Sequence, residues 1–387
     1  MLRFLTAGES HGPALTVILE GIPAGLPLTQ KDIDTQLRRR QKGYGSGGRM
    51  VIERDCAGLN SGVLNGCTTG APIALQIKNR DWSNWQARDI EPLTIPRPGH
   101  ADLTGAIKYG YRELRLALER ASARETAARV AAGAVCRRLL AEFEIVTGSY
   151  VVQIGQATAA LPENLSYPAR FAQAEEAETR CPIPAAAKAM RACIQQAIAT
   201  QDTLGGVFET VALGLPPGLG SHVHWDRRLD ARLMAAIGSI QGVKGVEIGP
   251  AFENASKFGT QVHDEILIQN GLLGRRTNRA GGFEGGISTG QAVVVRAAMK
   301  PIATTLTPLS SVDLATGKPA ATRYERSDTC AVPRAAVVGE AMLAFVLADA
   351  LLEKVGGDSL TEMRPRFAAL RRGSLQEMEM DNVPWRF

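Results

Sequence analysis

The 387-residue sequence predicts a mixed fold of helices and strands that is built from two similar halves. Stretches rich in strand-forming residues are separated by long candidate helices, which is typical of such a fold. The segment VILEGIPAGL at residues 17–26 also resembles VALGLPPGL at 211–219, and a candidate helix follows each. Because the two Pro-Gly turns lie about half a chain apart, the likeness indicates duplicated halves around one core.

The first half begins with a candidate strand at residues 14–26, which the first Pro-Gly turn closes. A helix is predicted over 29–41, because Thr29 with an aspartate three residues later is a helix-start signature. The segment MVIERD at 50–55 alternates as a strand does, and 71–79 is rich in strand-forming residues.

The clearest helix is predicted over residues 122–143. Ser122 and Glu125 form the S-x-x-E pattern of a capping box ahead of an alanine-rich stretch. Exposed backbone N–H groups at such a start attract anions, and Arg120 and Arg124 flank it. The segment is therefore either an ordinary capped helix or a helix whose start binds an anion.

The second half repeats this plan with a candidate helix at residues 226–240. Paired glycines at 281–282 and 285–286 lie in a second glycine-rich region, ahead of a strand that leads to Lys300. Such glycines allow the backbone to approach a flat or phosphorylated ligand closely, but a β-hairpin with bulges explains them equally well. No G-x-G-x-x-G follows the first strand, which disfavours a dinucleotide-binding unit.

The net charge of +5 is modest, but six basic side chains cluster in residues 38–54 around glycines. Three interpretations stay open: a solvated basic face, a site for a small polyanion, or a nucleic-acid surface. The nucleic-acid interpretation is the weakest, because Tyr44 is the only aromatic residue in the cluster.

Cysteine spacing and hydropathy predict a soluble cytoplasmic protein. The six cysteines form no C-x-x-C pair, and no leader segment precedes the first strand, so we expect reduced thiols. The most apolar run, at 340–355, is interrupted by Asp349, so we expect no membrane partner.

Two of the five histidines stand apart from the others. His222 and His224 form an H-x-H without a third candidate ligand, and His263 is an ordinary polar position, so we expect no metal. His11 and His100 instead lie in loops of small residues, GESHGP and RPGHAD. Histidines in open loops near basic segments are suited to donating a proton to an anionic leaving group.

A series of motifs along residues 6–336 carries a family resemblance. In order they are GESHG, RRQ-x-GYG…GRM, SGV-x-x-G-x-TTG-x-PI, RPGHADL-x-G, ER-x-SARETA-x-RVAAGA, DT-x-GG, GLPPGLG, WDRRLD, GVKGVEIG, TN-x-AGG-x-EGG-x-STG, KPI-x-T and RSD-x-C-x-VPRA. This collinear set resembles the chorismate synthase family.

The resemblance implies an enzyme that removes phosphate from 5-enolpyruvylshikimate 3-phosphate by anti 1,4-elimination, giving chorismate in the shikimate pathway. The reaction has no net redox change but requires reduced FMN, and NADPH has a place only as a reductant of that flavin. The implied fold is α+β: a β-α-β sandwich with central helices between antiparallel sheets and pseudo-duplicated halves. A single domain over residues 1–387 is expected, assembled as a homotetramer that binds a small-molecule substrate and no nucleic acid.

The same resemblance assigns roles by position in the motifs. His11 is expected to protonate the departing phosphate and His100 to lie near the flavin. Asp328, supported by Ser10 and Ser122, is expected to take up a proton. The expected FMN contacts are Arg120, Ala121, Ser122, Gln241, Gly242, Gly285, Lys300, Pro301, Ile302, Ala303, Thr304 and Arg326. The arginines expected to bind the substrate anion are Arg40, Arg49, Arg97, Arg124 and Arg326.

Several residues depart from the family pattern, among them Ala121, Glu113, Pro250 and Ala251, and the departure that bears on function is Ser46, which stands where an arginine is usual. It leaves open a family member that binds FMN with impaired turnover. A protein that binds polyanions or nucleic acid through residues 38–54 is the other alternative. The two loop histidines and Asp328 favour the lyase, because binding alone gives them no role.

Overall fold

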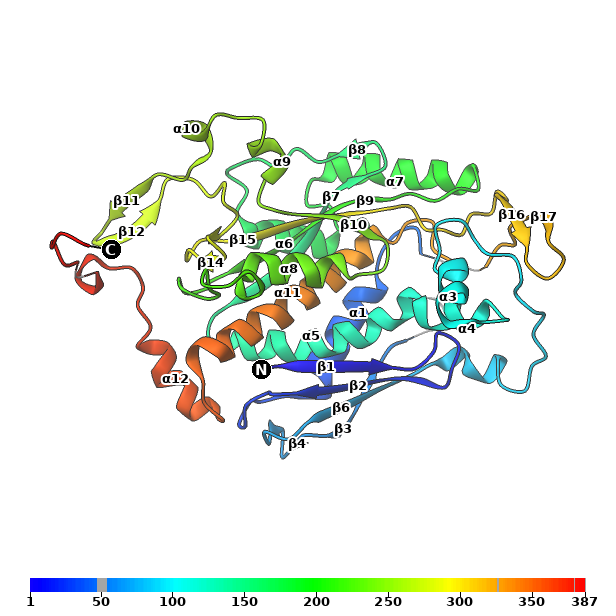
Figure 1. Cartoon of the computed structure of the whole chain (residues 1–387), viewed down its shortest axis with the longest axis horizontal. Coiled ribbons are helices and arrows are strands. Elements are labelled where there is room, and N and C mark those ends of the chain that lie inside the picture. Colours follow the sequence, from blue (N-terminus) through cyan, green and yellow to red (C-terminus); the bar gives the residue numbers. More distant parts are fainter. Residues whose placement is uncertain (47–53, 326, 379, 387) are drawn as a thin grey trace.

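Two antiparallel sheets enclose a central layer of helices (Figure 1). The computed structural model describes residues 1–46, 54–325, 327–378 and 380–386. The sandwich of sheets around central helices that the family resemblance implies is therefore confirmed.

The first sheet has the strand order β1-β2-β6-β3. Its strands are β1 (Arg3–Ala7), β2 (Ala14–Glu20), β6 (Ile73–Lys78) and β3 (Ala57–Ser61). Side chains alternate along β2, where Val17 and Leu19 are fully buried while Ile18 faces outward. The buried face packs against α5 (Thr126–Ala141), and α1 (Gln30–Gln41) lies between α5 and β3.

The second sheet has the order β10-β15-β9-β7-β8. Its strands are β10 (Val243–Ile248), β15 (Val293–Met299), β9 (Gly206–Leu213), β7 (Val146–Ile154) and β8 (Ala157–Thr158). The inner face packs against α8 (Leu229–Gly238) and α11 (Val332–Val355). Across the outer face lies α6 (Tyr167–Glu176), where Phe171 packs near Tyr150.

The helices α5 and α11 form the centre of the sandwich. A side chain cannot be accommodated at Gly133 of α5, because a Cβ atom there would lie 2.6 Å from the Cα of Ala341. The helix α11 is long and apolar enough to cross a membrane, but 83% of its most apolar window is buried inside the protein. Asp349, the charged residue within the apolar run of this helix, accepts a hydrogen bond from the Leu2 amide at 2.6 Å. The edge-to-face contact of Phe345 with Phe4 ties α11 to the first sheet as well.

The duplication indicated by the Pro-Gly turns extends to individual hydrogen bonds. Thr68 donates its hydroxyl to the carbonyl of Pro23 at 2.6 Å and accepts the amide of Leu26 at 2.9 Å. Ser288 makes the same two bonds in the second turn, at 2.7 and 2.8 Å. The sheets correspond too. In each half two antiparallel neighbours (β1 and β2, β7 and β9) are followed by a helix, α1 or α8, then by an edge strand, β3 or β10, and later by the strand that lies between them, β6 or β15.

The predicted helix at 29–41 is confirmed as α1, where Asp32 accepts hydrogen bonds from both the amide and the hydroxyl of Thr29. The predicted helix at 122–143 begins later than expected. After α4 (Arg115–Ala121) the chain makes a 3-10 turn over Ala123–Glu125, and α5 follows. The Ser122 side chain caps that turn by accepting the Arg124 amide. The strand expected at 50–55 lies mostly outside the described residues.

The remaining elements are short or peripheral. They are β4 (Val63–Leu64), β5 (Cys67–Thr68), η1 (Arg80–Asn84), α3 (Asp102–Tyr109), α7 (Pro184–Ala199), η3 (Trp225–Arg227), α9 (Ala251–Asn254), α10 (Gly259–Val262), β11 (Ile266–Gln269), β12 (Leu272–Arg275), β13 (Phe283–Glu284), β14 (Ile287–Ser288), β16 (Ser310–Asp313), β17 (Lys318–Ala321), α12 (Leu360–Ala368) and η4 (Leu375–Glu377).

Candidate active site

A cavity of about 860 Å³ lies at the end of the sandwich where both central helices begin. Thr126 at the start of α5 and Arg334 in the first turn of α11 line it. Helix N-termini carry partial positive charge, so two long helices starting at one cavity favour an anionic ligand. The other walls come from loops after β1, before α3, before β10 and after β15.

His11 projects from the loop between β1 and β2 and is held by Glu119 of α4. Its Nδ1 lies 2.8 Å from Oε1 of Glu119, and its backbone N–H donates to Oε2 at 2.7 Å. Burial alone would raise the pKa of Glu119, but hydrogen bonds from His11 and nearby positive charge lower it below the usual value. Glu119 is therefore a carboxylate at neutral pH and fixes the orientation of the imidazole.

His100 is held in the same way by Asp102, at the start of α3. Its Nδ1 lies 2.5 Å from Oδ1 of Asp102, while Arg97 donates to both oxygens of that carboxylate at 2.8 and 3.0 Å. Burial opposes ionisation of Asp102, but the hydrogen bonds from His100 and Arg97 outweigh it and hold its pKa well below the ordinary range. Arg97 also donates to the Thr304 hydroxyl at 3.0 Å, which joins this group to the loop after β15.

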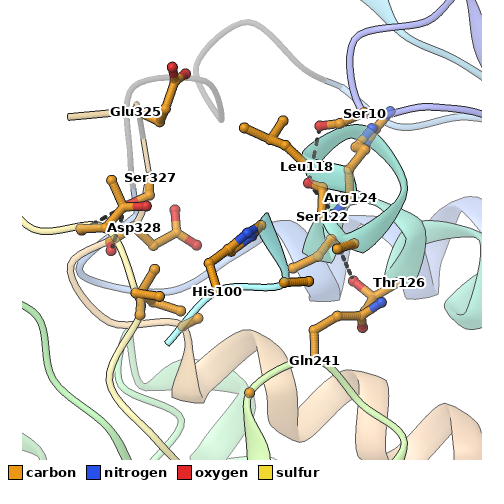
Figure 2. A pocket seen from close by; sticks show the side chains of 18 of the residues that line it. Ser10, His100, Leu118, Ser122, Arg124, Thr126, Gln241, Glu325, Ser327 and Asp328 are labelled. Carbon is orange, nitrogen blue, oxygen red and sulfur yellow. Dashed lines mark hydrogen bonds between the residues drawn. The ribbon is translucent and has the colours of Figure 1, made fainter. Parts of the chain in front are cut away.

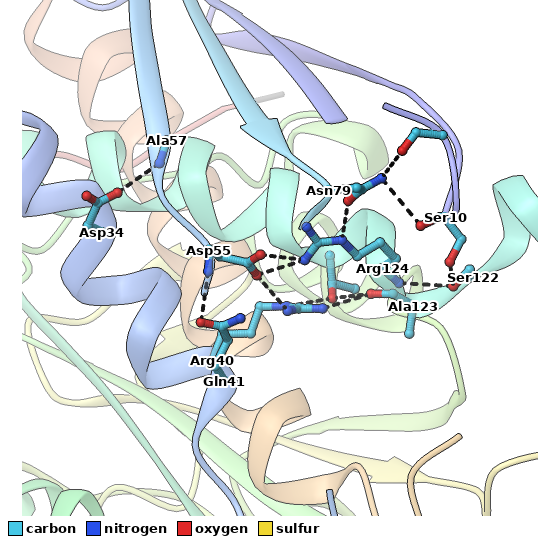
Figure 3. Close-up of polar contacts among 12 residues, drawn as sticks. Ser10, Asp34, Arg40, Gln41, Asp55, Ala57, Asn79, Ser122, Ala123 and Arg124 are labelled. Carbon is cyan, nitrogen blue, oxygen red and sulfur yellow. Dashed lines mark hydrogen bonds and ion pairs between the residues drawn. The ribbon is translucent and has the colours of Figure 1, made fainter. Parts of the chain in front are cut away.

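Two arginines share one buried aspartate (Figure 3). Arg124 donates through Nη1 to both oxygens of Asp55 at 2.7 and 2.8 Å, and Arg40 approaches the same carboxylate at 3.5 Å. Burial lowers the pKa of Arg40 to about 10, with Asp55 opposing the shift and Arg124 adding to it. With a pKa near 10, Arg40 is still a cation at neutral pH. Two guanidinium groups therefore share one carboxylate beside the cavity.

Asp328 lines the cavity next to α11. Its Oδ2 accepts a hydrogen bond from Nη1 of Arg334 at 2.6 Å. Across the cavity, the hydroxyl of Ser122 donates to that of Ser10 at 3.1 Å. In the view of Figure 2, His100 lies between Asp328 on one side and the two serines on the other. The arrangement places acidic, basic and hydroxyl groups around one volume.

Most of the remaining residues expected at an FMN site also line the cavity. They are Ala121, Ser122, Gln241, Gly242, Lys300, Pro301, Ile302, Ala303 and Thr304. Partial burial, together with the charge of Lys244, lowers the pKa of Lys300 below its ordinary value. Ile240, Val243 and Met299 add an apolar wall.

Two expected FMN contacts lie outside the cavity as the described residues define it. Arg120 is turned toward β1, where it donates to the carbonyl and hydroxyl oxygens of Thr6 at 2.8 and 2.7 Å. Gly285 lies in the tight turn between β13 and β14, so its region forms the hairpin that was the alternative interpretation. Arg49 and Arg326 lie outside the described residues. The hydroxyl of Ser46 folds back onto the Gly43 carbonyl.

The basic cluster at 38–54 does not form one solvated face in the part that the structure describes. Arg39 is largely buried and pairs with Glu175 and Glu340, and Arg40 lines the cavity. Arg38 remains exposed, donating to the neighbouring Thr35 hydroxyl. The polyanion-site interpretation therefore fits better than a continuous nucleic-acid surface.

Five residues that sequence reasoning did not single out help to form the site. They are Asp55, Trp85, Asp102, Glu119 and Arg334. Asp102, Glu119 and Arg334 fall inside the recognised motifs, so their position was a usable signal. Asp55 and Trp85 lie outside the motifs, and only the fold brings them to the cavity. Among the described residues, no cluster of three or more His, Cys, Asp or Glu side chains could hold a metal ion.

The cavity, with its acidic, basic and hydroxyl side chains, is of the kind found in enzymes that act on small molecules. The sequence profile described as chorismate synthase matches residues 2–352. A chorismate synthase of Aquifex aeolicus is 55% identical over 383 residues, covering 95% of this chain and 96% of the relative. One of Desulforudis audaxviator is 56% identical over 375 residues, with 94% and 95% covered. A crystal structure of chorismate synthase superimposes with a TM-score of 0.79 at 48% identity, over 95% of this chain and 96% of the other. The chain belongs to the chorismate synthase family and is a lyase.

Proposed function

We propose that the cavity binds reduced FMN and 5-enolpyruvylshikimate 3-phosphate together and that the chain converts this substrate to chorismate and phosphate. The observation that carries the proposal is the convergence of two carboxylate-held histidines, Asp328 and a cationic group on one cavity. These residues come from both halves of the chain. The reaction is proposed from family membership, and the cavity is the site to which we assign it.

The residues present fit a flavin. The volume of about 860 Å³ lies near the upper end of the usual range for ligand pockets, which leaves room for two ligands. We assign the flavin to Ala121, Ser122, Gln241, Gly242 and the loop of residues 300–304, where apolar side chains suit a flat ring and Lys300 suits a phosphate. When bound, the reduced ring supplies the electron density that allows an allylic C–O bond to break without net redox change.

The substrate anion is assigned to Arg40, Arg97 and Arg124. Arg97 already pairs with Asp102, while Arg40 and Arg124 share one carboxylate. Two guanidinium groups thus face one carboxylate at Asp55, so the excess positive charge of the cavity wall lies on Arg40 and Arg124. Because these guanidinium groups are buried and fixed by hydrogen bonds, they attract an anion without first having to be ordered.

The proton transfers are assigned to the chain's own groups. The bond between the substrate ring and the phosphate oxygen breaks, and His11 gives its proton to the departing phosphate. The ring loses hydrogen from C6 as the new double bond forms, and Asp328 is the final acceptor of that proton. Arg334 balances the charge of the Asp328 carboxylate before the transfer. His100 is assigned to the flavin side, where Asp102 fixes its orientation.

Turnover under anaerobic conditions tests the proposal. The purified chain is mixed with 5-enolpyruvylshikimate 3-phosphate and dithionite-reduced FMN, and chorismate and phosphate are followed together. We expect the two products in equal amounts, and none with oxidised FMN. Absence of product from correctly folded protein would refute the proposal. Replacing dithionite by NADPH shows whether the chain reduces the flavin itself.

We further propose that the whole chain, residues 1–387, acts as one domain and assembles as a homotetramer in the cytoplasm. The resemblance to the family supports all three statements. Sedimentation velocity gives the mass of the assembly directly, and a mass equal to one chain would contradict the tetramer.

A further inference from the structure

The segment around Trp85 has no role in the proposed chemistry, yet it lies directly against His11. The ring centroids of Trp85 and His11 are 4.0 Å apart, and the two planes are tilted by 35°. Both side chains line the cavity. The contact is therefore a close, tilted aromatic pair at the position assigned to the proton donor.

Trp85 is itself fixed in place. Its indole N–H donates to Oδ2 of the buried Asp81 at 3.2 Å, and its backbone N–H donates to the Trp82 carbonyl at 2.9 Å. The guanidinium carbons of Arg88 and Arg115 each lie 5.8 Å from the centre of the indole ring. An aromatic ring held on several sides is a rigid surface for a neighbour to pack on.

Glu119 and Trp85 contact the His11 imidazole from different directions. Glu119 holds its Nδ1 edge and the backbone N–H of the same residue. The Trp85 indole packs against the ring, so a rotation of the imidazole would lose this aromatic contact as well as the hydrogen bond.

We propose that Trp85 is a positioning residue that fixes the plane of the His11 imidazole for proton transfer to the departing phosphate. The proposal rests on the proposed function, since it assigns to Trp85 a place in that same reaction. It predicts that Trp85 acts on turnover through His11 and has no comparable effect on flavin binding.

A double-mutant cycle tests the proposal. Trp85→Leu removes the aromatic face, Trp85→Phe keeps an aromatic ring, and Trp82→Phe is the matched control in the same segment. We expect Trp85→Leu to lower kcat roughly 10-fold with KM and the FMN dissociation constant nearly unchanged. Trp85→Phe should retain most of the wild-type kcat. In a His11→Ala background, Trp85→Leu should have little further effect, because the group it positions is absent.

The opposing results are equally specific. If Trp85→Leu costs the same factor with and without His11, Trp85 does not act through His11 and the proposal is wrong. A raised KM or FMN dissociation constant would instead make Trp85 a ligand contact. If Trp85→Leu does not fold, Trp85→Met takes its place in the same cycle. A loss of kcat confined to the protein that carries His11 supports the proposal, and an equal loss in the His11→Ala background refutes it.

Tryptophan fluorescence separates this proposal from the proposed function. At a fixed pH, His11→Ala should change the emission of the protein when Trp85 is present and leave it unchanged when Trp85 is replaced by Phe. This readout requires no turnover. If wild-type protein makes no chorismate, the proposed function fails, while an unchanged emission would refute the contact between Trp85 and His11.

Discussion

Both carboxylate oxygens of Asp55 lie within 2.8 Å of Nη1 of Arg124. Asp55 is 2% exposed, so its removal leaves two buried guanidinium groups without their shared counter-ion. We expect Asp55→Ala to lower the free energy of unfolding by about 3–5 kcal/mol, as for other broken buried ion pairs. Urea denaturation measures the change. Asp89→Ala, at an exposed aspartate, is the control, and equal losses in the two variants would contradict the role of Asp55.

The two histidines that line the cavity should be essential, whereas an exposed histidine with a similar partner should not. His224 pairs with Asp226 through Nδ1 at 2.8 Å, as His11 and His100 pair with their carboxylates, but it lies at the surface. We expect His11→Ala and His100→Ala each to lower turnover by roughly 10-fold to 10⁴-fold, the range for lost acid–base help. His224→Ala should retain wild-type turnover. A near-wild-type rate in either cavity variant would remove that residue from the mechanism.

The packing of the two central helices should tolerate no added methyl group. At Gly133 a new Cβ would meet the backbone of Ala341 at 2.6 Å, whereas at Gly238 the nearest atom is a Val246 methyl at 3.7 Å. Overpacking of this kind costs about 1–3 kcal/mol. We expect Gly133→Ala to lower the thermal midpoint and Gly238→Ala to leave it unchanged or raise it. Calorimetry on both variants decides, and a stable Gly133→Ala protein would show that the helices can move apart.

Acid should weaken the ion pairs that anchor α1 behind the cavity. Burial would raise the pKa of Glu175, but hydrogen bonds from Arg180 and Arg39 lower it from 4.5 to about 2. Because the folded-state pKa lies below the unfolded value, these pairs contribute stability above pH 4.5 that is lost as pH falls toward 2. We expect Glu175→Gln to flatten the pH dependence of the unfolding free energy over this window. The exposed Glu163→Gln should keep the wild-type slope, and identical slopes for both variants would exclude the pairing.

Local signals in the sequence predicted the helices better than they predicted the residues of the candidate active site. The helix start at Thr29 was confirmed, because its cap needs only two residues three positions apart. Ser122 carried the same signal, but there it caps a 3-10 turn, and local sequence does not distinguish that turn from the α-helix that follows. The prediction was therefore right about the helix and early about its start.

The site required long-range information that a single sequence lacks. Composition left the role of His11 open, and only the order of motifs assigned it. Asp55 reaches Arg124 across 69 positions of the chain, and no periodicity or cap records such a pair. The glycine pairs at 281–282 and 285–286 show the opposite case. Their pattern suits a ligand-binding loop, but in the structure Gly285 lies in the hairpin between β13 and β14 and does not line the cavity.

The late position of α11 in the chain has a consequence for how the protein is made. This helix packs against the second sheet, α5 and Phe4 of β1, so neither half can finish its core before residue 355 emerges. At about 5–20 residues per second, the side of α5 that α11 will cover stays exposed on the order of tens of seconds after α5 has been made. Folding is therefore completed near the end of synthesis, and a chain stopped before α11 would be a substrate for chaperones and proteases even though every residue of the first sheet had been made.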